Sequence, residues 1–303
     1  MNRLIQEINA KSIISRSKHP SSWFGVEYGM NIYRGCQHGC IYCDSRSECY
    51  HVEQFDEDII VKINAVELLE QQLRKMRKRY TIGTGAMSDP YMPIEKKYQL
   101  TRKTLEIIEQ FQMRVHIATK SNLILRDIDI LESISKRYAS VAMTITTMNE
   151  DLAKVIEPHA PSPKERMEAV GILNSVGIKA GLLVMPQLPY LMEDREHLEG
   201  LVMAAKYCDA QFVYPGFGVT LRDRQREYYY NKLEEFYPEL VAKYKSRFDN
   251  NYMAACVNQK KMKEYFYQRC KEEGVFVGMP SYHKELANEL NRQLSLPLDS
   301  DKN

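Results

Sequence analysis

The sequence lacks any long hydrophobic run. Its longest apolar stretches, such as 181–185, are far shorter than the roughly 20 residues that a membrane-spanning helix needs. Residues 1–7 also lack the apolar core of a signal peptide. We therefore expect a soluble, cytoplasmic protein with no membrane segment.

An excess of charge of one sign is also absent. The 42 Lys and Arg residues nearly balance the 40 Asp and Glu residues, which gives a net charge of +2. Such a small charge does not by itself imply nucleic-acid binding. Two local basic clusters, 74–79 and 222–226, could contact phosphates, but for each of them the alternative is a solvated helix face.

The cysteines do not show a disulfide-like distribution. The chain has seven, an odd number, and four of them fall between positions 36 and 49. This distribution indicates a reducing compartment and a metal site. Cys36, Cys40 and Cys43 are spaced so that their thiolates can bind three irons of a 4Fe-4S cluster and leave the fourth iron open. The alternative is a zinc knuckle with His38 or Cys49 as fourth ligand, but no second ligand pair with zinc-like spacing exists.

This cysteine motif resembles that of the radical S-adenosylmethionine superfamily, in which the unique iron chelates the methionine end of the cofactor. Tyr42, directly before Cys43, fits that family's preference for an aromatic residue beside the adenine. The resemblance implies a 4Fe-4S cluster with three cysteine ligands, S-adenosylmethionine as cofactor, and a flavodoxin or ferredoxin as electron donor. It also implies reductive cleavage of the cofactor, followed by hydrogen abstraction from the substrate.

Strand and helix patterns alternate along most of the chain. We expect strands at 29–33, 59–63, 80–84, 114–118, 141–146, 178–184 and 211–214, and helices near 65–79, 98–110, 126–137, 163–176 and 193–207. The helix at 163 begins with Ser162 as N-cap and Glu165 completing a capping box. Repeated βα units predict a parallel sheet. Six units are too few for the usual eight-unit barrel, so we expect an α/β fold with an open partial (β/α)6 barrel.

The expected organisation has four parts. Residues 1–28 are an approach segment that closes over one barrel end, and 29–215 form the barrel core. Residues 216–284 form a C-terminal extension with helices around 224–245 and 259–273, and 285–303 form a flexible tail.

Polar residues follow the predicted strands at their carboxyl ends, where α/β folds build their sites. A zwitterionic sulfonium cofactor needs a cation near its carboxylate, hydroxyls or a carboxylate near its ribose, and an apolar surface for its adenine. The residues that could supply these groups are Lys120, Ser88, Asp89, Thr144 and Met185. The alternatives are a surface lysine for Lys120 and an ordinary turn for 88–90.

Several of these segments resemble the spore photoproduct lyase group. They are the Ser88-Asp89 turn, Lys120 with its preceding threonine, and the segment 156–166 that leads into 177–181. The similarity runs from about residue 29 to about residue 215 and implies that Ser88, Asp89, Lys120 and Thr144 contact the cofactor. It also implies a lesion in DNA as the substrate.

One residue departs from that group. A hydrogen-donating cysteine precedes its Ser-Asp pair by two residues, where this chain has Ala86. Our hypothesis is that Cys49 donates the hydrogen, with Tyr91 or Tyr42 as relay, because Cys49 is close in sequence to the cysteine motif. The alternative for Cys49 is a small buried apolar residue.

The tail contains a short motif that resembles the peptide by which bacterial repair and replication proteins bind the DNA polymerase sliding clamp. Its residues are Gln293, Leu294, Ser295, Leu296, Pro297 and Leu298. The glutamine can hydrogen-bond at a pocket rim, and the leucines can fill an apolar groove when a disordered tail folds on binding. The alternative is a frayed, slightly apolar terminus.

Three functions stay open from the sequence. The first is a radical enzyme that processes damaged DNA in repair, similar to spore photoproduct lyase. The second is a radical S-adenosylmethionine enzyme that modifies RNA, protein or a metabolite. The third is a non-catalytic iron-sulfur or zinc protein that binds DNA and the clamp.

Overall fold

The computed structural model describes residues 4–20 and 23–286 and contains a central seven-stranded sheet. Its strands are β2 (Ile14–Arg16), β3 (Tyr28–Met30), β6 (Thr81–Thr84), β7 (Arg114–Thr119), β8 (Ala139–Thr144), β9 (Lys179–Val184) and β10 (Val213–Pro215). The strand order is β10-β9-β8-β7-β6-β3-β2, and only β2 runs antiparallel to its neighbour. Six parallel strands therefore form an open sheet with β10 and β2 at its edges in the described part of the chain, which confirms the predicted partial barrel.

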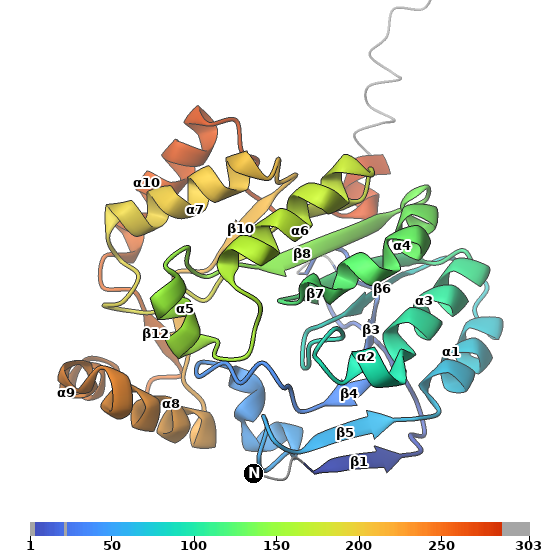
Figure 1. Cartoon of the computed structure of the whole chain (residues 1–303), viewed down its shortest axis with the longest axis horizontal. Helices are drawn as coiled ribbons and strands as arrows, with labels where there is room; N and C mark the ends of the chain where they lie inside the picture. The colour runs from blue at the N-terminus through green and yellow to red at the C-terminus, as the bar shows by residue number, and fades with distance from the viewer. Residues whose placement is uncertain (1–3, 21–22, 287–303) are drawn as a thin grey trace, which may run out of the picture.

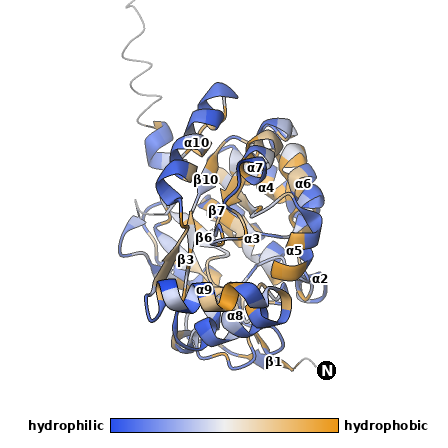
Figure 2. Ribbon diagram, turned by 90° about the vertical axis from the view of Figure 1, so that its left-hand side faces the viewer, coloured by the Kyte–Doolittle hydropathy of each residue, from blue (hydrophilic) through white to orange (hydrophobic). Residues whose placement is uncertain are grey.

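Helices cover the outer face of this sheet (Figure 1). Those that pack on its strands are α3 (Leu100–Gln110), α4 (Ile128–Ser135), α6 (Pro163–Ser175) and α7 (Arg195–Tyr207), and α1 (Ala65–Arg74) packs against α3. The connections also contain α2 (Glu95–Tyr98), α5 (Glu150–Ile156) and a 3-10 helix, η4 (Asn122–Asp127). Every residue of β7 and β8 is buried, as expected for parallel strands that are covered on both faces. Figure 2 shows hydrophobic residues in the central strands and hydrophilic residues along outer helices.

The start of α6 is fixed by the predicted capping box. The Ser162 hydroxyl accepts a hydrogen bond from the Glu165 backbone N–H at 3.2 Å, and the Glu165 carboxylate accepts one from the Ser162 backbone N–H at 2.7 Å. These bonds satisfy backbone donors that a helix N-terminus otherwise leaves unpaired. Segment 157–161, which precedes this cap, contacts the loop that carries the cysteines, because the His159 N–H donates to the His38 carbonyl at 3.1 Å.

The N-terminal segment enters the barrel interior. Phe24 stacks on His116 of β7 with 4.2 Å between ring centroids, and Trp23 lies edge-on to Tyr214 of β10 at 6.0 Å. Phe24 belongs to a buried apolar cluster that includes Phe212. Aromatic side chains from outside the βα units thus fill the space between the strands.

A second, small sheet lies below the main one in Figure 1 and has the order β1-β5-β4. Its strands are β1 (Ile5–Ile8), β4 (Tyr33–Arg34) and β5 (Ile59–Lys62). The strand predicted at 29–33 is therefore wrong as one element, because β3 pairs in the main sheet and β4 pairs with β5. The chain turns between them, where the Lys62 ammonium donates to the Asn31 carbonyl at 2.5 Å.

The C-terminal extension differs from its prediction in one helix and in a hairpin that was not predicted. The helix predicted at 224–245 is two helices, α8 (Asp223–Phe236) and α9 (Pro238–Phe248), because Pro238 cannot continue a helix but is favourable at the start of one. The extension also contains an antiparallel hairpin and a last helix, namely β11 (Gly218–Thr220), β12 (Met253–Ala255) and α10 (Gln259–Glu272). Helix α10 packs against α7, and α8 lies beside the 3-10 helix η2 (Asp44–Arg46).

Candidate active site

The cluster loop, residues 35–43, follows β4 and carries the three closely spaced cysteines. Cys36, Cys40 and Cys43 line a cavity of about 310 Å³ at the carboxyl ends of the parallel strands. The loop requires glycine at position 35, where φ is +78° and a Cβ would lie 2.2 Å from the Asp58 carbonyl oxygen. The fold thus brings the three thiols to one cavity.

Backbone hydrogen bonds hold the cluster loop from two directions. The Cys36 N–H donates to the Phe55 carbonyl at 2.8 Å, and the Ile41 N–H donates to the Ile156 carbonyl at 3.0 Å. The second bond joins the loop to the end of α5, more than a hundred residues later in the chain. The positions of the cysteines therefore depend on tertiary contacts as well as on the loop sequence.

The environment of the three thiols disfavours bare thiolates. Burial, followed by the nearby Asp89 charge, raises the pKa of Cys36, and burial raises the pKa of Cys40 to about 12 and that of Cys43 as well. Cysteine binds metal as the thiolate, so a bound cation is needed to hold these groups deprotonated. Among the described residues, no three His, Cys, Asp or Glu side chains gather closely enough to hold a single ion. In a 4Fe-4S cluster, by contrast, each thiolate binds a different iron.

The residues predicted to contact the cofactor line the same cavity as the cysteines. They are Tyr42, Ser88, Asp89, Lys120, Thr144 and Met185. They come from the cluster loop and from the carboxyl ends of β6, β7, β8 and β9. The parallel sheet brings them together, because the carboxyl ends of parallel strands lie at the same edge of the sheet.

Both carboxylate oxygens of Asp89 are already bound by protein donors. Oδ1 accepts from the Tyr91 N–H at 2.8 Å and the Thr119 hydroxyl at 2.7 Å, and Oδ2 accepts from the Lys120 N–H at 2.6 Å. His38 Nε2 lies 3.1 Å from Oδ2. Burial raises the pKa of Asp89, but His38 and these hydrogen bonds outweigh it and lower the pKa to about 2. Asp89 thus joins the cluster loop to the end of β7, and it also lines the cavity.

Two neighbouring polar groups have no hydrogen-bond or ion-pair partner among the described residues. The buried Ser88 hydroxyl has no hydrogen-bond partner among the described residues. The Lys120 ammonium forms no hydrogen bond or ion pair within that part of the chain and lies 5.6 Å from the centroid of the Tyr42 ring. Burial lowers the pKa of Lys120, but nearby Cys40 and Glu157 raise it more, so the net pKa lies above its usual value. The cavity therefore presents a hydroxyl and a cation that can bind an anionic or polar ligand.

A buried acid and base behind Tyr42 were not identified from the sequence. The Tyr42 hydroxyl donates to Glu157, whose carboxylate also accepts from the Thr146 hydroxyl at 3.1 Å. Arg166 Nη1 lies 2.6 Å from Glu157 Oε2, and the two side chains are 1% and 0% exposed. Arg166 also donates to the Thr144 carbonyl at 2.8 Å. Because burial of a charge pair is a tertiary property, the letters at 157 and 166 carried no signal for it beyond the family resemblance.

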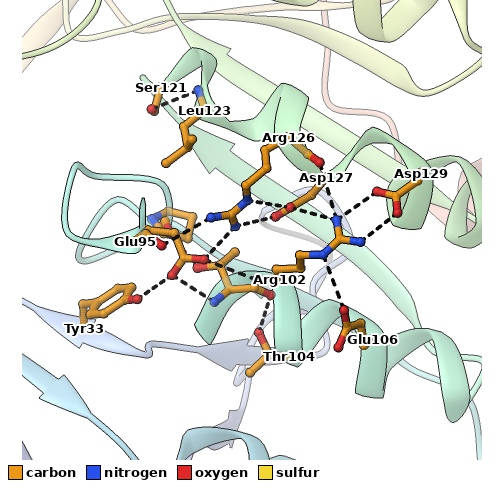
Figure 3. A network of polar contacts seen from close by, with 12 residues as sticks. Tyr33, Glu95, Arg102, Thr104, Glu106, Ser121, Leu123, Arg126, Asp127 and Asp129 are labelled. Atoms are coloured by element: carbon orange, nitrogen blue, oxygen red, sulfur yellow. Dashed lines mark hydrogen bonds and ion pairs between the residues drawn. The ribbon is translucent and has the colours of Figure 1, made fainter. Parts of the chain in front are cut away.

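A second buried network includes Tyr33 of β4, the strand that leads into the cluster loop (Figure 3). Glu95, whose side chain is fully buried, accepts hydrogen bonds from the Tyr33 hydroxyl at 2.5 Å and from Arg126 Nη2 at 2.8 Å. Arg126 and Arg102 both pair with the buried Asp127, at 2.8 and 3.2 Å. The network thus ties β4, which leads into the cluster loop, to η4 after β7.

The proposed relay residue Tyr91 lies next to Arg126 of this network. It is fully buried, and the Arg126 guanidinium lies 6.0 Å from its ring centroid. Burial, followed by Asp127, raises the pKa of Tyr91 well above its usual value. Tyr91 lies outside the lining of the cavity. Close to it in sequence, the Ile94 N–H donates a hydrogen bond to the Gln37 side chain of the cluster loop at 2.7 Å. Residues 91–95 thus pack beside the cluster loop and bind it through Ile94.

Cys49, the proposed hydrogen donor, is exposed and also lies outside the cavity lining. Its sulfur accepts from the Ser47 hydroxyl at 3.3 Å and from Arg222 Nη1 at 3.7 Å. Ala86 does line the cavity, at the position where the resembled group has cysteine. The described residues include all seven cysteines, and those that line the cavity are the three of the cluster loop.

Comparison with known proteins identifies the class to which this site belongs. A model of the Radical SAM superfamily matches residues 30–202, more than half of the chain. The chain therefore belongs to the Radical SAM superfamily and is an enzyme of the kind that uses an iron-sulfur cluster and S-adenosylmethionine.

Two relatives are uncharacterized proteins. One, from Methanocaldococcus jannaschii, is 34% identical over 243 residues, which cover 79% of this chain and 86% of that protein. Another, from Mycobacterium tuberculosis, is 28% identical over 246 residues, which cover 79% of this chain and 72% of that protein.

The fold resembles solved structures of spore photoproduct lyase. A mutant of that enzyme aligns with a TM-score of 0.64 at 15% identity, and a complex with dinucleoside spore photoproduct aligns with a TM-score of 0.63 at 16% identity. Each alignment covers 90% of this chain and 81% of the other. At this identity the likeness establishes a common fold, and the reaction is a separate question.

Two other expectations from the sequence concern membrane segments and the C-terminal tail. None of the helices in residues 4–20 and 23–286 has the length and apolar character to cross a bilayer. The clamp-like motif at 293–298 lies outside the described residues.

Proposed function

We propose that this radical SAM enzyme processes a lesion in DNA. The observation that carries the proposal is one cavity that joins three cysteines to an unpartnered Ser88 hydroxyl and Lys120 ammonium, within the fold of spore photoproduct lyase. That lyase has been solved in complex with dinucleoside spore photoproduct. A damaged base would leave the helical stack to reach such a cavity.

The residues fit the two cofactors of the family. Cys36, Cys40 and Cys43 would hold a 4Fe-4S cluster, and the charged Lys120 would bind the carboxylate of S-adenosylmethionine. With the cluster reduced by a flavodoxin or ferredoxin, the two bound groups would supply a carbon radical that removes hydrogen from the substrate. The buried, unpaired Ser88 hydroxyl would receive a hydrogen-bonding group of the cofactor, because an orphaned buried hydroxyl is otherwise unfavourable.

The other residues that line the cavity shape the site and exclude water from it. Trp23, Leu183 and Met185 form apolar parts of its wall, and Tyr42 places its ring beside the cluster loop. Excluding water protects a reactive intermediate from side reactions. Thr144 and Tyr42 are positioned from behind by the buried pair of Glu157 and Arg166. In the proposal, these contacts orient the cofactor toward the open side of the cavity.

Return of hydrogen to the product is assigned to Cys49, with Tyr42 or Tyr91 as relay. Ala86 lines the cavity at the position where the spore photoproduct lyase group has its hydrogen-donating cysteine, so this position offers no thiol. Because Cys49 is exposed beside Arg222, the proposal needs substrate to extend from the cavity toward that surface. The clamp-like motif would raise the enzyme's local concentration at DNA without any new contact in the cavity.

Loss of the Lys120 charge is expected to weaken cofactor binding strongly. In Lys120→Met, the dissociation constant for S-adenosylmethionine should rise about 10- to 100-fold, the usual effect of losing a hydrogen bond to a charged group. Equilibrium dialysis with reconstituted protein measures this change. Lys154→Met is a matched control, because Lys154 is 72% exposed, pairs with the exposed Asp151 and lies outside the cavity lining. Equal affinity in both variants would show that the carboxylate binds elsewhere.

The function itself is tested by cofactor cleavage. Anaerobically reconstituted, dithionite-reduced protein should form 5'-deoxyadenosine faster with ultraviolet-irradiated DNA than with undamaged DNA. Such a rise would support both the radical chemistry and a lesion substrate. Equal, slow formation with both DNAs would withdraw the lesion while keeping the cofactor, and RNA, peptides or metabolites would replace it as candidate substrates. Absence of cleavage under all conditions would favour a non-catalytic metalloprotein.

A further inference from the structure

The N-terminal turn of α8 lies against the segment that follows Cys43. Figure 1 shows α8 beside the blue segment that follows β4 and precedes β5 in the chain, and α8 contacts η2. This contact was not expected, because the sequence of 222–226 indicated a phosphate-binding cluster or a solvated helix face. In the structure, three consecutive residues of this turn, Asp223, Arg224 and Gln225, bind segment 42–52.

Gln225 holds the backbone of the cluster loop itself. Its side chain is fully buried, and its Nε2 donates to the Tyr42 carbonyl at 3.2 Å. Its Oε1 accepts from the Arg222 N–H at 2.9 Å, so both ends of the amide are bound. Tyr42 is thus fixed at two points, because Gln225 binds its carbonyl and Glu157 accepts from its hydroxyl.

Asp223 and Arg224 bind the chain just after the cysteines. The Asp223 carboxylate accepts from the Ser47 hydroxyl at 2.8 Å and from the Glu48 N–H at 3.2 Å. The Asp223 pKa is lowered, because the bonds from Ser47 and Glu48 outweigh the effect of burial. Arg224 donates to the Arg46 carbonyl at 3.2 Å and to the Val52 carbonyl at 2.5 Å.

These bonds cross about 175 residues of sequence and come from outside the family match. The Radical SAM model covers residues 30–202, whereas α8 starts at Asp223. The segment between Cys43 and β5 contains only the short 3-10 helices η2 and η3 (Glu48–Tyr50), which have little stability of their own. Contacts from α8 therefore restrict a stretch that would otherwise sample several conformations.

We propose that Asp223, Arg224 and Gln225 are positioning residues that hold the cluster loop and the ring of Tyr42 in place. The C-terminal extension is then part of the active centre and not an accessory to the barrel. The inference rests on the proposed function in one respect only, namely that the cluster loop binds the iron-sulfur cluster.

The positional part of the inference is tested without any cofactor. In the full-length apo chain, Asp223→Ala is expected to speed hydrogen exchange of segment 44–52 by about tenfold, because two hydrogen bonds to a charged group are lost. Glu227→Ala is the matched control, since Glu227 is exposed one turn later on the same helix. Exchange in 44–52 that is equal in wild type and Asp223→Ala would overturn the inference, whatever the enzyme's substrate is.

The functional part is tested with reconstituted protein. Gln225→Ala is expected to lose bound iron to a chelator about tenfold faster than wild type, while Glu227→Ala loses it at the wild-type rate. Gln225→Glu keeps the side-chain size but replaces the donor by an acceptor, so it should behave like Gln225→Ala if the bond to the Tyr42 carbonyl is what matters. Unchanged iron release in both Gln225 variants, with faster exchange in Asp223→Ala, would limit α8 to a structural role. A wild-type chain that binds no iron would refute the proposed function and leave the exchange result intact.

Discussion

Cys40→Ala is expected to eliminate the iron-sulfur cluster and to reduce 5'-deoxyadenosine formation by at least about a hundredfold, because cluster irons are held by cysteine thiolates. Cys40 is buried and shares the cavity wall with Cys36 and Cys43. Alanine removes the ligand and adds no group that could replace it. Iron and sulfide content and the visible absorption of the reconstituted protein measure the first effect, and chromatography of the cofactor products measures the second.

The control for this experiment is a cysteine far from the cavity. Cys208 is buried at the C-terminal end of α7, outside the cavity lining, and its thiol donates to the Ala205 carbonyl at 3.6 Å. Cys208→Ala should keep wild-type iron content, with a small loss of stability from the smaller side chain. If Cys40→Ala also kept full iron content, the proposed ligand set would be wrong. If the wild-type protein were colourless and contained zinc, the alternative of a zinc site would be correct instead.

The sequence predicted the barrel and most of the cavity because both follow from local patterns. Alternating strand and helix segments predict a parallel sheet, and a parallel sheet collects the residues after each strand at one edge. Ser88 and Lys120, which lie after different strands, could therefore be assigned to one site before their positions were known. The capping box at Ser162 was equally visible, because all its parts lie within four residues.

Tertiary pairing could not be derived in this way. The run 29–33 reads as one strand, yet its two ends pair in different sheets, and nothing local specifies which partner each end takes. Glu95 and Glu157 are charged residues in segments whose sequences resemble ordinary loops and helix ends. Their complete burial depends on Arg126 and Arg166, which come from later elements. Charge patterns indicate solvent exposure on average, and these buried pairs are exceptions to that average.

The cluster 222–226 shows the same limit. Its arginines look available for phosphate, but Arg224 is bound to two carbonyls of segment 46–52 and Arg226 to those of Leu221 and Asn251. These bonds tie both guanidinium groups to backbone carbonyls within the fold. The support for DNA binding therefore comes from the fold and the cavity, and not from this basic segment.

Arg166→Met is expected to lower the free energy of unfolding by about 3–5 kcal/mol, because it leaves the Glu157 carboxylate buried without its partner. Both side chains are almost fully buried at a separation of 2.6 Å. Methionine preserves much of the side-chain volume, so the loss reports the charge and not a large cavity. Urea unfolding of the apo chain near neutral pH measures it.

The double variant Glu157→Gln with Arg166→Met separates charge from packing. It should recover most of the lost stability, because no buried charge remains and glutamine can still accept from the Tyr42 and Thr146 hydroxyls. A double variant as unstable as Arg166→Met alone would show that Arg166 acts through its bond to the Thr144 carbonyl instead.

The pH dependence gives an independent check on the same pair. Burial raises the pKa of Glu157, but Arg166 and Lys120 outweigh it and lower the pKa below the usual 4.5. A carboxyl whose pKa is lowered by folding stabilises the protein above its unfolded-state pKa, and this contribution is lost as pH falls through the folded-state value. Wild-type stability should therefore decrease as the pH falls below about 4.5, its ordinary value. In Arg166→Met the carboxyl is harder to ionise, so the destabilisation relative to wild type should shrink as the pH is lowered. A stability difference that is independent of pH between 4 and 7, roughly the range over which a carboxyl titrates, would mean that the buried charge is not its source.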